Sequence, residues 1–377
     1  MTNILYSIKK QNDEDLMWSY PINTFRCLSF FKNHDINLDF DFINEKNQNQ
    51  YDLIFSDSRF LNKKILDTQE KPLIVYDQTD FSSCYNGNYG DIRDFLCHDK
   101  VKAVFKNSVY ENLEYHNCDT YEGTLHGKIC LDLAIKNSEK DISCLNDCKK
   151  NQVIDKSIFG KMCVLSHYLW SDIVDKSLIP NLNHEIYQNL HLRPIDVILI
   201  GSGSHYWNWH VRWHREKAIS AMNKLPNEVI RCCGLSQDKN LAKHRKSVVW
   251  PMPPQYFSLC YKSKIVVSPW GYGEVSTRDY EAILCGNIII KPRLMSQNLQ
   301  IKTYPDLYDG ENVVFCEPDF SDLEIKVYEI LNNYDKYASA AVKKARLFYD
   351  IYKSNSAFEN LLLLFKKILN EKKLKYF

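Results

Sequence analysis

The chain has 377 residues, of which 45% are hydrophobic, so it is long enough for two domains of ordinary size, each with its own core. Its 48 basic and 47 acidic residues give a formal charge of +1, which provides no overall attraction to nucleic acid or to an anionic membrane. The thirteen cysteines are odd in number and irregularly spaced, which favours reduced, buried thiols over disulfides.

The ends of the chain carry no membrane signal. The amino-terminal segment lacks the apolar core of a signal peptide, and no apolar run approaches the roughly 18 residues that span a bilayer. We therefore expect a cytoplasmic protein without a transmembrane segment, for which peripheral contact with a membrane stays open.

In the first half, short apolar runs alternate with helix-length segments, which is typical of a parallel sheet covered by helices. The pattern predicts helices over 23–32 and 91–97, and it predicts strands over 4–8, 36–42, 51–55, 73–76, 101–105 and, less regularly, 162–165.

The second half restarts this rhythm with the run IDVILIGSGS, which begins at Ile195. Further strands are predicted over 229–233, 265–268, 288–291 and 313–316, with helices over 213–224, 254–261, 276–285, 322–331 and 357–372. We predict an α/β protein with a first domain over 1–185, a second domain over 186–355 and a terminal helix over 356–377.

The run from Ile195 ends in a glycine turn that enters a helix. Backbone N–H groups at such turns favour anions, so Gly201, Gly203 and the following Arg215 form a candidate phosphate site. A nicotinamide-dependent oxidoreductase is the alternative, but Tyr206 replaces the third glycine of its fingerprint, and the next strand is followed by an acidic residue only at the late Asp238.

Two groups of side chains raise the question of a metal. His205, His210 and His214 follow the glycine turn without a carboxylate placed as a further ligand, and Cys144 and Cys148 lack a second pair at metal-ligand spacing. We therefore expect packing or hydrogen-bonding histidines and no metal site.

The stretch SPWGYGEVSTRDYEAILCGNIIIKP, residues 268–292, concentrates glycine and charge between two predicted strands. Ser276 or Thr277 is a natural N-cap, which places Arg278 and Glu281 on one face of the following helix. An ordinary ion pair between these two side chains would leave the glycines, Glu274 and Lys291 unexplained.

This stretch resembles glycosyltransferases of the GT-B fold, in particular exostosin-like and group 1-like enzymes, whose second domain carries the form S-P-x-G-x-G-x-x-x-x-R-x-x-E-A-x-x-x-G. The resemblance implies two Rossmann-like domains, of which the first binds a glycan or glycosylated acceptor and the second binds a nucleotide-diphosphate sugar as donor substrate. It also implies that no metal or other cofactor is required. The donor-binding residues that we predict are Gly201, Gly203, Arg215, Ser268, Gly271, Tyr272, Gly273, Glu274, Ser276, Thr277, Arg278, Glu281 and Lys291.

Within that resemblance, Arg278 would stabilise the charge of the leaving diphosphate and Glu281 would hold the ribose. Retaining group 1 enzymes carry a first glutamate eight residues before the second, but that position is Gly273 here and Glu274 follows one residue late. The offset favours an inverting transferase.

Inversion requires a base on the acceptor side. Asp77 and Asp80 follow the strand 73–76 and are the predicted bases, with Asp80 favoured, and His126 in the segment TLHGK is a further candidate. A protein that binds nucleotide sugars or glycans without catalysing transfer is the alternative that the sequence leaves open.

Overall fold

The structure of the protein is a computed structural model, and it describes residues 2–7, 25–41, 50–58, 61, 63–77, 92–116, 120–121, 124–137, 148–149, 156–164, 187–202, 209–236, 253–271, 273–294, 300–354 and 356–374. The predicted boundary between residues 185 and 186 lies outside these ranges, as do Cys144, His205 and Tyr206.

A first sheet of six parallel strands is formed in the order β2-β1-β3-β4-β5-β9. Its strands are β1 (Thr2–Ser7), β2 (Ile36–Asp41), β3 (Leu53–Asp57), β4 (Leu73–Asp77), β5 (Val101–Lys106) and β9 (Met162–Val164). All five residues of β4 are buried, because helices cover both faces of the sheet. A central strand in this position is most stable when most of its residues are apolar. The irregular run at 162–165 is thus confirmed as a strand.

A second sheet repeats this topology with five parallel strands in the order β11-β10-β12-β13-β15. Its strands are β10 (Ile195–Ser202), β11 (Arg231–Ser236), β12 (Ser263–Val267), β13 (Ile288–Pro292) and β15 (Val313–Cys316). In both sheets the second strand along the chain lies on one side of the first and the third on the other, so each sheet has the switch point of a doubly wound fold.

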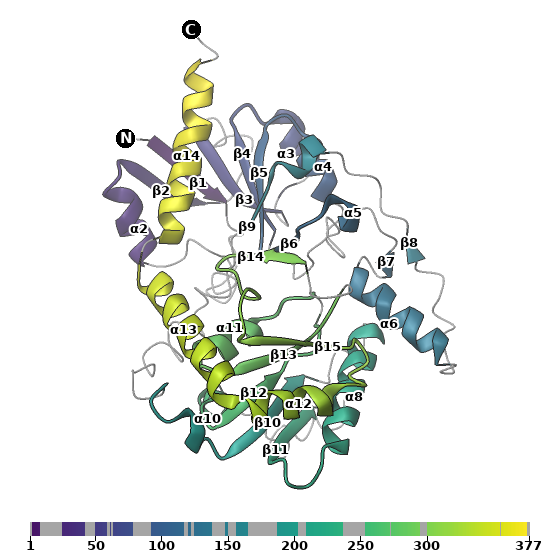
Figure 1. Ribbon diagram of the computed structural model, residues 1–377. Coiled ribbons are helices and arrows are strands. Elements are labelled where there is room, and N and C mark those ends of the chain that lie inside the picture. The colour runs from purple at the N-terminus through teal and green to yellow at the C-terminus, as the bar shows by residue number, and fades with distance from the viewer. Residues whose placement is uncertain are drawn as a thin grey trace.

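Helices connect the strands and cover the sheets (Figure 1). The helices of the first half are α2 (Phe25–Lys32), α3 (Lys63–Thr68), α4 (Ile92–Cys97), α5 (Leu113–His116), α6 (Leu125–Lys136) and α7 (Lys156–Phe159). Those of the second half are α8 (Trp209–Lys224), α10 (Pro253–Tyr261), α11 (Thr277–Leu284), α12 (Leu323–Asn332), α13 (Tyr334–Lys353) and α14 (Ser356–Leu374), and a short 3-10 helix, η9 (Leu190–Leu192), precedes β10. Helix α8 begins four residues earlier than the periodicity predicts.

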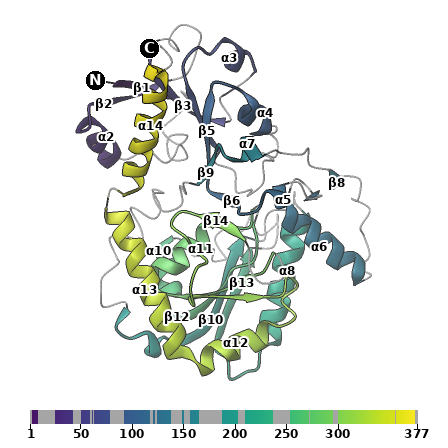
Figure 2. The ribbon, with the colours of Figure 1, turned by 45° about the horizontal axis from the view of Figure 1, so that its top comes forward.

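The two halves of the chain are interlocked at three places. Strand β6 (Ser108–Tyr110) pairs antiparallel with β14 (Ile301–Thr303), and this short sheet lies between the two large sheets in both views (Figures 1 and 2). Helix α6 packs against α8. Helix α14 returns to the first sheet and packs against α2. A further short pair, β7 (Thr120–Tyr121) with β8 (Cys148–Lys149), completes the described strands.

The terminal helix α14 is held by an aromatic cluster. The Phe365 ring lies 5.5 Å from the ring of Phe31 on α2 and 6.3 Å from that of Phe55 on β3, centroid to centroid. The sequence predicts an amphipathic helix at this place without indicating which domain it covers, and the structure assigns it to the first.

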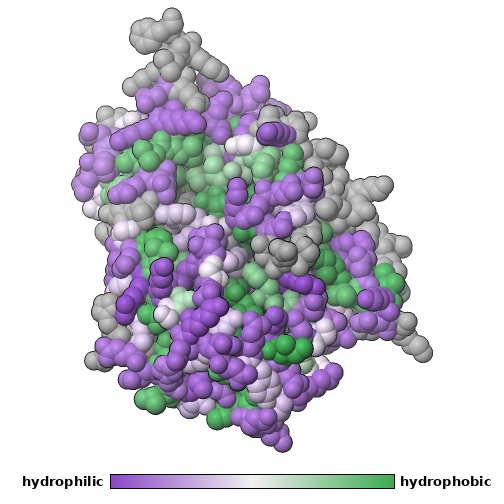
Figure 3. Space-filling view, in the orientation of Figure 1, coloured by the Kyte–Doolittle hydropathy of each residue, from purple (hydrophilic) through white to green (hydrophobic). Residues whose placement is uncertain are grey.

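The surface around this scaffold is mixed. On the face shown in Figure 3, hydrophilic residues predominate over the second domain and apolar residues are interspersed among them. Within the described part of the chain, no helix is both long enough and apolar enough to cross a membrane.

Candidate functional site

The candidate site begins at the carboxyl ends of β10 and β12, the neighbouring strands at which the order of the second sheet reverses. Gly201 is the penultimate residue of β10, and Ser268 directly follows β12 and is fully buried. Ligands of open parallel sheets bind outside the carboxyl ends of the strands at such a switch point. The structure therefore brings these two predicted residues to one edge, whereas Gly203 and Tyr272 lie outside the described residues.

The glycine-rich loop after β12 is anchored to α8. The backbone N–H of Trp270 donates to Nδ1 of His214 over 3.1 Å, and the two rings stack at 4.4 Å between centroids. A Cβ atom placed on Gly271 would lie 3.7 Å from the guanidinium of the buried Arg215, and the N–H of Gly271 donates to the carbonyl of Gly273 over 3.0 Å. A predicted phosphate-binding arginine thus lies against the predicted phosphate-binding loop.

This anchoring also decides the role of the histidines. His210 and His214 lie one helical turn apart on α8 and are both buried, and burial lowers the pKa of His214 well below its ordinary value. Because Nδ1 of His214 accepts a hydrogen bond, the ring is a neutral packing partner of Trp270. Among the described residues, no three His, Cys, Asp or Glu side chains gather as ligands of a metal ion.

Helix α11 begins at the same edge. Its N-cap is Ser276, as predicted, and the N–H of Ser276 donates to Oδ2 of Asp279 over 2.8 Å. The buried Asp279 also accepts from the ammonium of Lys291 over 2.8 Å and from the hydroxyl of Tyr308 over 3.2 Å. Lys291 therefore has a carboxylate partner that the sequence analysis passed over, and its predicted contact with phosphate stays a prediction. The spacing of Ser276 and Asp279, a capping box, is the signal that could have revealed Asp279.

Arg278 and Glu281 lie on the first turns of α11, where Thr277 is the first helical residue, and both are half-buried. Burial of the carboxyl group raises the pKa of Glu281 to about 7, and Arg278 opposes that rise. Nε of Arg278 has no hydrogen-bond partner among the described residues. The core positions of this helix are Tyr280, Ile283 and Leu284, as predicted.

Glu274 joins the site to the first half of the chain. Its side chain is fully buried, and Oε1 accepts from the hydroxyl of Tyr110 over 2.5 Å and lies 2.9 Å from Nδ1 of His126. Burial alone would raise the pKa of this carboxyl group, but attraction to the imidazolium form of His126 and the hydrogen bonds of His126 and Tyr110 outweigh it and lower the pKa to about 2. Sequence reasoning named His126 and Glu274 separately and missed their contact.

The predicted bases differ in their surroundings. Asp77 ends β4, is fully buried and forms an ion pair with the equally buried Lys106 of β5. Asp80 lies outside the described residues. The roles of both stay predictions.

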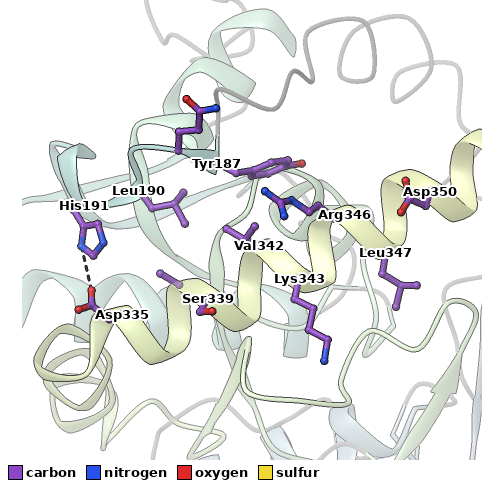
Figure 4. Close-up of a pocket in the computed structure, with 12 residues that line it drawn as sticks. Tyr187, Leu190, His191, Asp335, Ser339, Val342, Lys343, Arg346, Leu347 and Asp350 are labelled. Carbon is purple, nitrogen blue, oxygen red and sulfur yellow. Dashed lines mark ion pairs between the residues drawn. The ribbon is translucent and has the colours of Figure 1, made fainter.

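A separate cavity of about 610 Å³ runs along α13 (Figure 4). It is lined by Lys343 and Arg346 of α13 and by residues that precede β10, among them His191, whose Nδ1 lies 3.3 Å from a carboxylate oxygen of Asp335. Because these residues lead into the amino end of β10, the cavity lies away from the carboxyl edge, and none of its lining residues belongs to the predicted site.

The pKa of Glu281 predicts a pH-dependent stability. The folded state holds its proton up to about pH 7, whereas the unfolded chain releases it near 4.5, so the contribution is complete below pH 4.5 and is lost as the pH rises through 7. We expect Glu281→Gln to remove this slope and to raise the free energy of unfolding at pH 8 by at most about 3 kcal/mol, since one pKa unit is worth about 1.4 kcal/mol. Urea unfolding between pH 4 and 8 measures it.

The exposed Glu324→Gln serves as the matched control, for which we expect the wild-type slope. If the wild-type protein and Glu281→Gln lost the same free energy of unfolding over this pH range, that result would contradict the burial of the Glu281 carboxyl group.

No family model matches the chain, and no curated protein matches its sequence. Solved structures that are similar to this chain include MnaA of S. aureus with UDP. That match has 10% identity over 98% of this chain and 97% of that chain, with a TM-score of 0.49. Sucrose-phosphate synthase from Thermosynechococcus elongatus has 10% identity over 98% and 100% of the two chains and a TM-score of 0.49. UDP-GlcNAc 2-epimerase from Neisseria meningitidis has 12% identity over 97% and 99% and a TM-score of 0.45.

Similarity at this level says nothing about the functional residues or the activity of this chain. Its fold is therefore assigned from its own topology. Two separate parallel sheets with the same strand order, each covered by helices, are joined by segments that cross from one to the other. The chain therefore has a GT-B-like fold of two Rossmann-like α/β domains, as its sequence predicts.

Proposed function

We propose that the protein uses a nucleotide-diphosphate sugar and that it is a glycosyltransferase, which moves the sugar to a hydroxyl group of a glycan or glycosylated acceptor with inversion. One observation carries the proposal. The glycine loop at Gly271, the buried guanidinium of Arg215 and the first turn of α11 meet at the carboxyl edge of the second sheet, at its switch point. A diphosphate needs close backbone approach, a helix N-terminus and a guanidinium, and all of them are present.

The chemistry of transfer follows from these groups. As the bond between the sugar C1 and the diphosphate oxygen lengthens, negative charge grows on the leaving group, and Arg215, Arg278 and the N–H groups at the start of α11 would stabilise it. Glu281 would accept hydrogen bonds from the ribose hydroxyls. Such bonds favour the ionised carboxylate, so nucleotide binding is expected to lower the raised pKa of Glu281.

Nucleotide binding is expected to stabilise the folded protein. A ligand at a hundredfold excess over its Kd contributes about 2.7 kcal/mol, which corresponds to a rise in Tm of about 3 °C for a chain of 377 residues. A thermal-shift screen against UDP, GDP, CDP, ADP and their sugar conjugates measures it.

Arg215→Ala and Arg278→Ala should lose most of that shift. Arg231 is the matched control, because it lies at the start of β11, at the opposite edge of the sheet, and Arg231→Ala should keep the shift. A screen in which no nucleotide raises the Tm of the wild-type protein would overturn the proposed donor site.

A further inference from the structure

The contact between Glu274 and His126 has the geometry of a carboxylate that orients an imidazole. His126 is the second residue of α6, and its position is set by the N-cap Thr124, whose hydroxyl accepts from the N–H of Gly127 over 3.1 Å. Glu274 lies in the glycine-rich loop of the other domain. The pair therefore forms where α6 packs against α8 and joins residues from both halves of the chain.

The hydrogen-bond pattern decides the tautomer of His126. The Tyr110 hydroxyl and Nδ1 of His126 both reach Oε1 of Glu274, at 2.5 and 2.9 Å. An ionised carboxylate only accepts hydrogen bonds, so Nδ1 must carry a hydrogen. In the neutral ring, Nε2 then holds the lone pair, which is the arrangement of a general base that is oriented by a carboxylate.

Nε2 of His126 has no partner among the described residues, although the side chain is only 1% exposed. Buried polar atoms are nearly always hydrogen-bonded, and one that is left unpaired costs free energy that a ligand can recover. Around it, the ring of Trp270 lies 5.5 Å away and that of His210 lies 5.1 Å away, centroid to centroid. Trp270 belongs to the glycine loop and His210 to α8, so the ring of His126 lies beside two of the elements that build the donor site.

We propose that His126 is the general base of the transfer reaction and that Glu274, supported by Tyr110, is the positioning residue. This inference rests on the proposed transferase function. Nε2 of His126 takes the proton of the acceptor hydroxyl while the oxygen of that hydroxyl forms a bond to C1 of the sugar. The bond between C1 and the diphosphate oxygen breaks, and its electron pair leaves with the diphosphate. The imidazolium, stabilised by Glu274, returns its proton to water.

Asp77 suits this task less well, because the buried ammonium of Lys106 already pairs with it. Within the described part of the chain, the titratable groups around His126 are Glu274 from the loop, Tyr110 from β6, which shares Oε1 of Glu274 with it, and His210 and His214 from α8.

The test compares His126→Asn and Glu274→Gln with the wild-type protein. The asparagine amide can still donate to Glu274 from the place of Nδ1, but it removes Nε2. The assay is release of UDP or GDP from UDP-glucose, UDP-N-acetylglucosamine and GDP-mannose, with water as the hydroxyl acceptor. We expect kcat of His126→Asn to fall roughly 10²–10⁴-fold, with an unchanged KM and an unchanged Tm shift by UDP or GDP.

The pH–rate profile separates a base from a structural histidine. The wild-type rate should fall on the acid side as the imidazole is protonated, and His126→Asn should lose that limb. Glu274→Gln should shift this acid-side fall of the rate, because a neutral amide no longer stabilises the imidazolium. The exposed His191→Gln is the control and should behave as the wild type does.

The outcomes distinguish the two proposals. If no nucleotide of the thermal-shift screen raises the Tm of the wild-type protein, or the wild-type protein releases nucleotide from none of the sugar conjugates in that screen, the transferase fails and the base assignment fails with it. If the wild-type protein turns over and His126→Asn keeps kcat within threefold, or keeps the acid limb, only the assignment of His126 is overturned. Should His126→Asn fold poorly, the folded Glu274→Gln variant provides the test. An acid-side fall of its rate at the same pH as in the wild-type protein overturns the proposed pairing of Glu274 with His126.

Discussion

Replacing Lys291 by methionine is expected to lower the free energy of unfolding by about 3–5 kcal/mol, because it leaves the carboxylate of Asp279 buried without its cation. The ammonium of Lys291 and the carboxylate of Asp279 are both fully buried and lie 2.8 Å apart. Burial lowers the pKa of Lys291, and Asp279 opposes that change. The charged form of Lys291 is therefore stabilised by its contact with Asp279. Urea unfolding at pH 7 measures the loss.

A second replacement shows whether the ion pair is the cause. In Lys291→Met/Asp279→Asn, the amide oxygen can still accept from Ser276, but no charge is left unpaired, so the double variant should recover at least half of the loss. Lys302→Met on the exposed position of β14 is the matched control and should change stability by less than about 0.5 kcal/mol. A loss below 1 kcal/mol for Lys291→Met would contradict the buried pair.

Replacing Phe365 by alanine is expected to cost about 3–5 kcal/mol, because the fully buried ring fills the contact of α14 with the first domain. The cavity would open between Phe31 of α2 and Phe55 of β3, whose rings both contact Phe365. Urea unfolding followed by circular dichroism gives the free energy.

Leu363→Ala is the control for Phe365→Ala. Leu363 lies two residues away on the same helix and is 65% exposed, so its loss should be close to zero. Equal effects of the two replacements would mean that α14 does not dock by the face that the structure shows.

The strands of both sheets could be predicted from the sequence because each is a local property. Central strands of a parallel sheet are buried on both faces, so they appear as short continuous apolar runs, as at β4 and β13. The short strands β6 and β14 could not be predicted, since three residues carry too little pattern, and their pairing joins distant parts of the chain.

The candidate site was predictable to a similar degree. Glycines, an N-cap and an arginine in one segment indicate a site for an anion, and the structure brings Arg215 to Gly271 as expected. The helix Leu125–Lys136, by contrast, was not predicted, so the sequence offered no reason to place His126 beside the second domain.

The sequence by itself thus determined the α/β class, the two-domain order and the segment that holds the candidate site, because periodicity, capping and glycine turns act over a few residues. Only the tertiary structure decided which side chains meet. Lys291 pairs with Asp279, and Glu274 reaches across to His126 and Tyr110. These contacts form because buried charges require partners, and which partner is within reach depends on how the two halves pack, which no local pattern encodes.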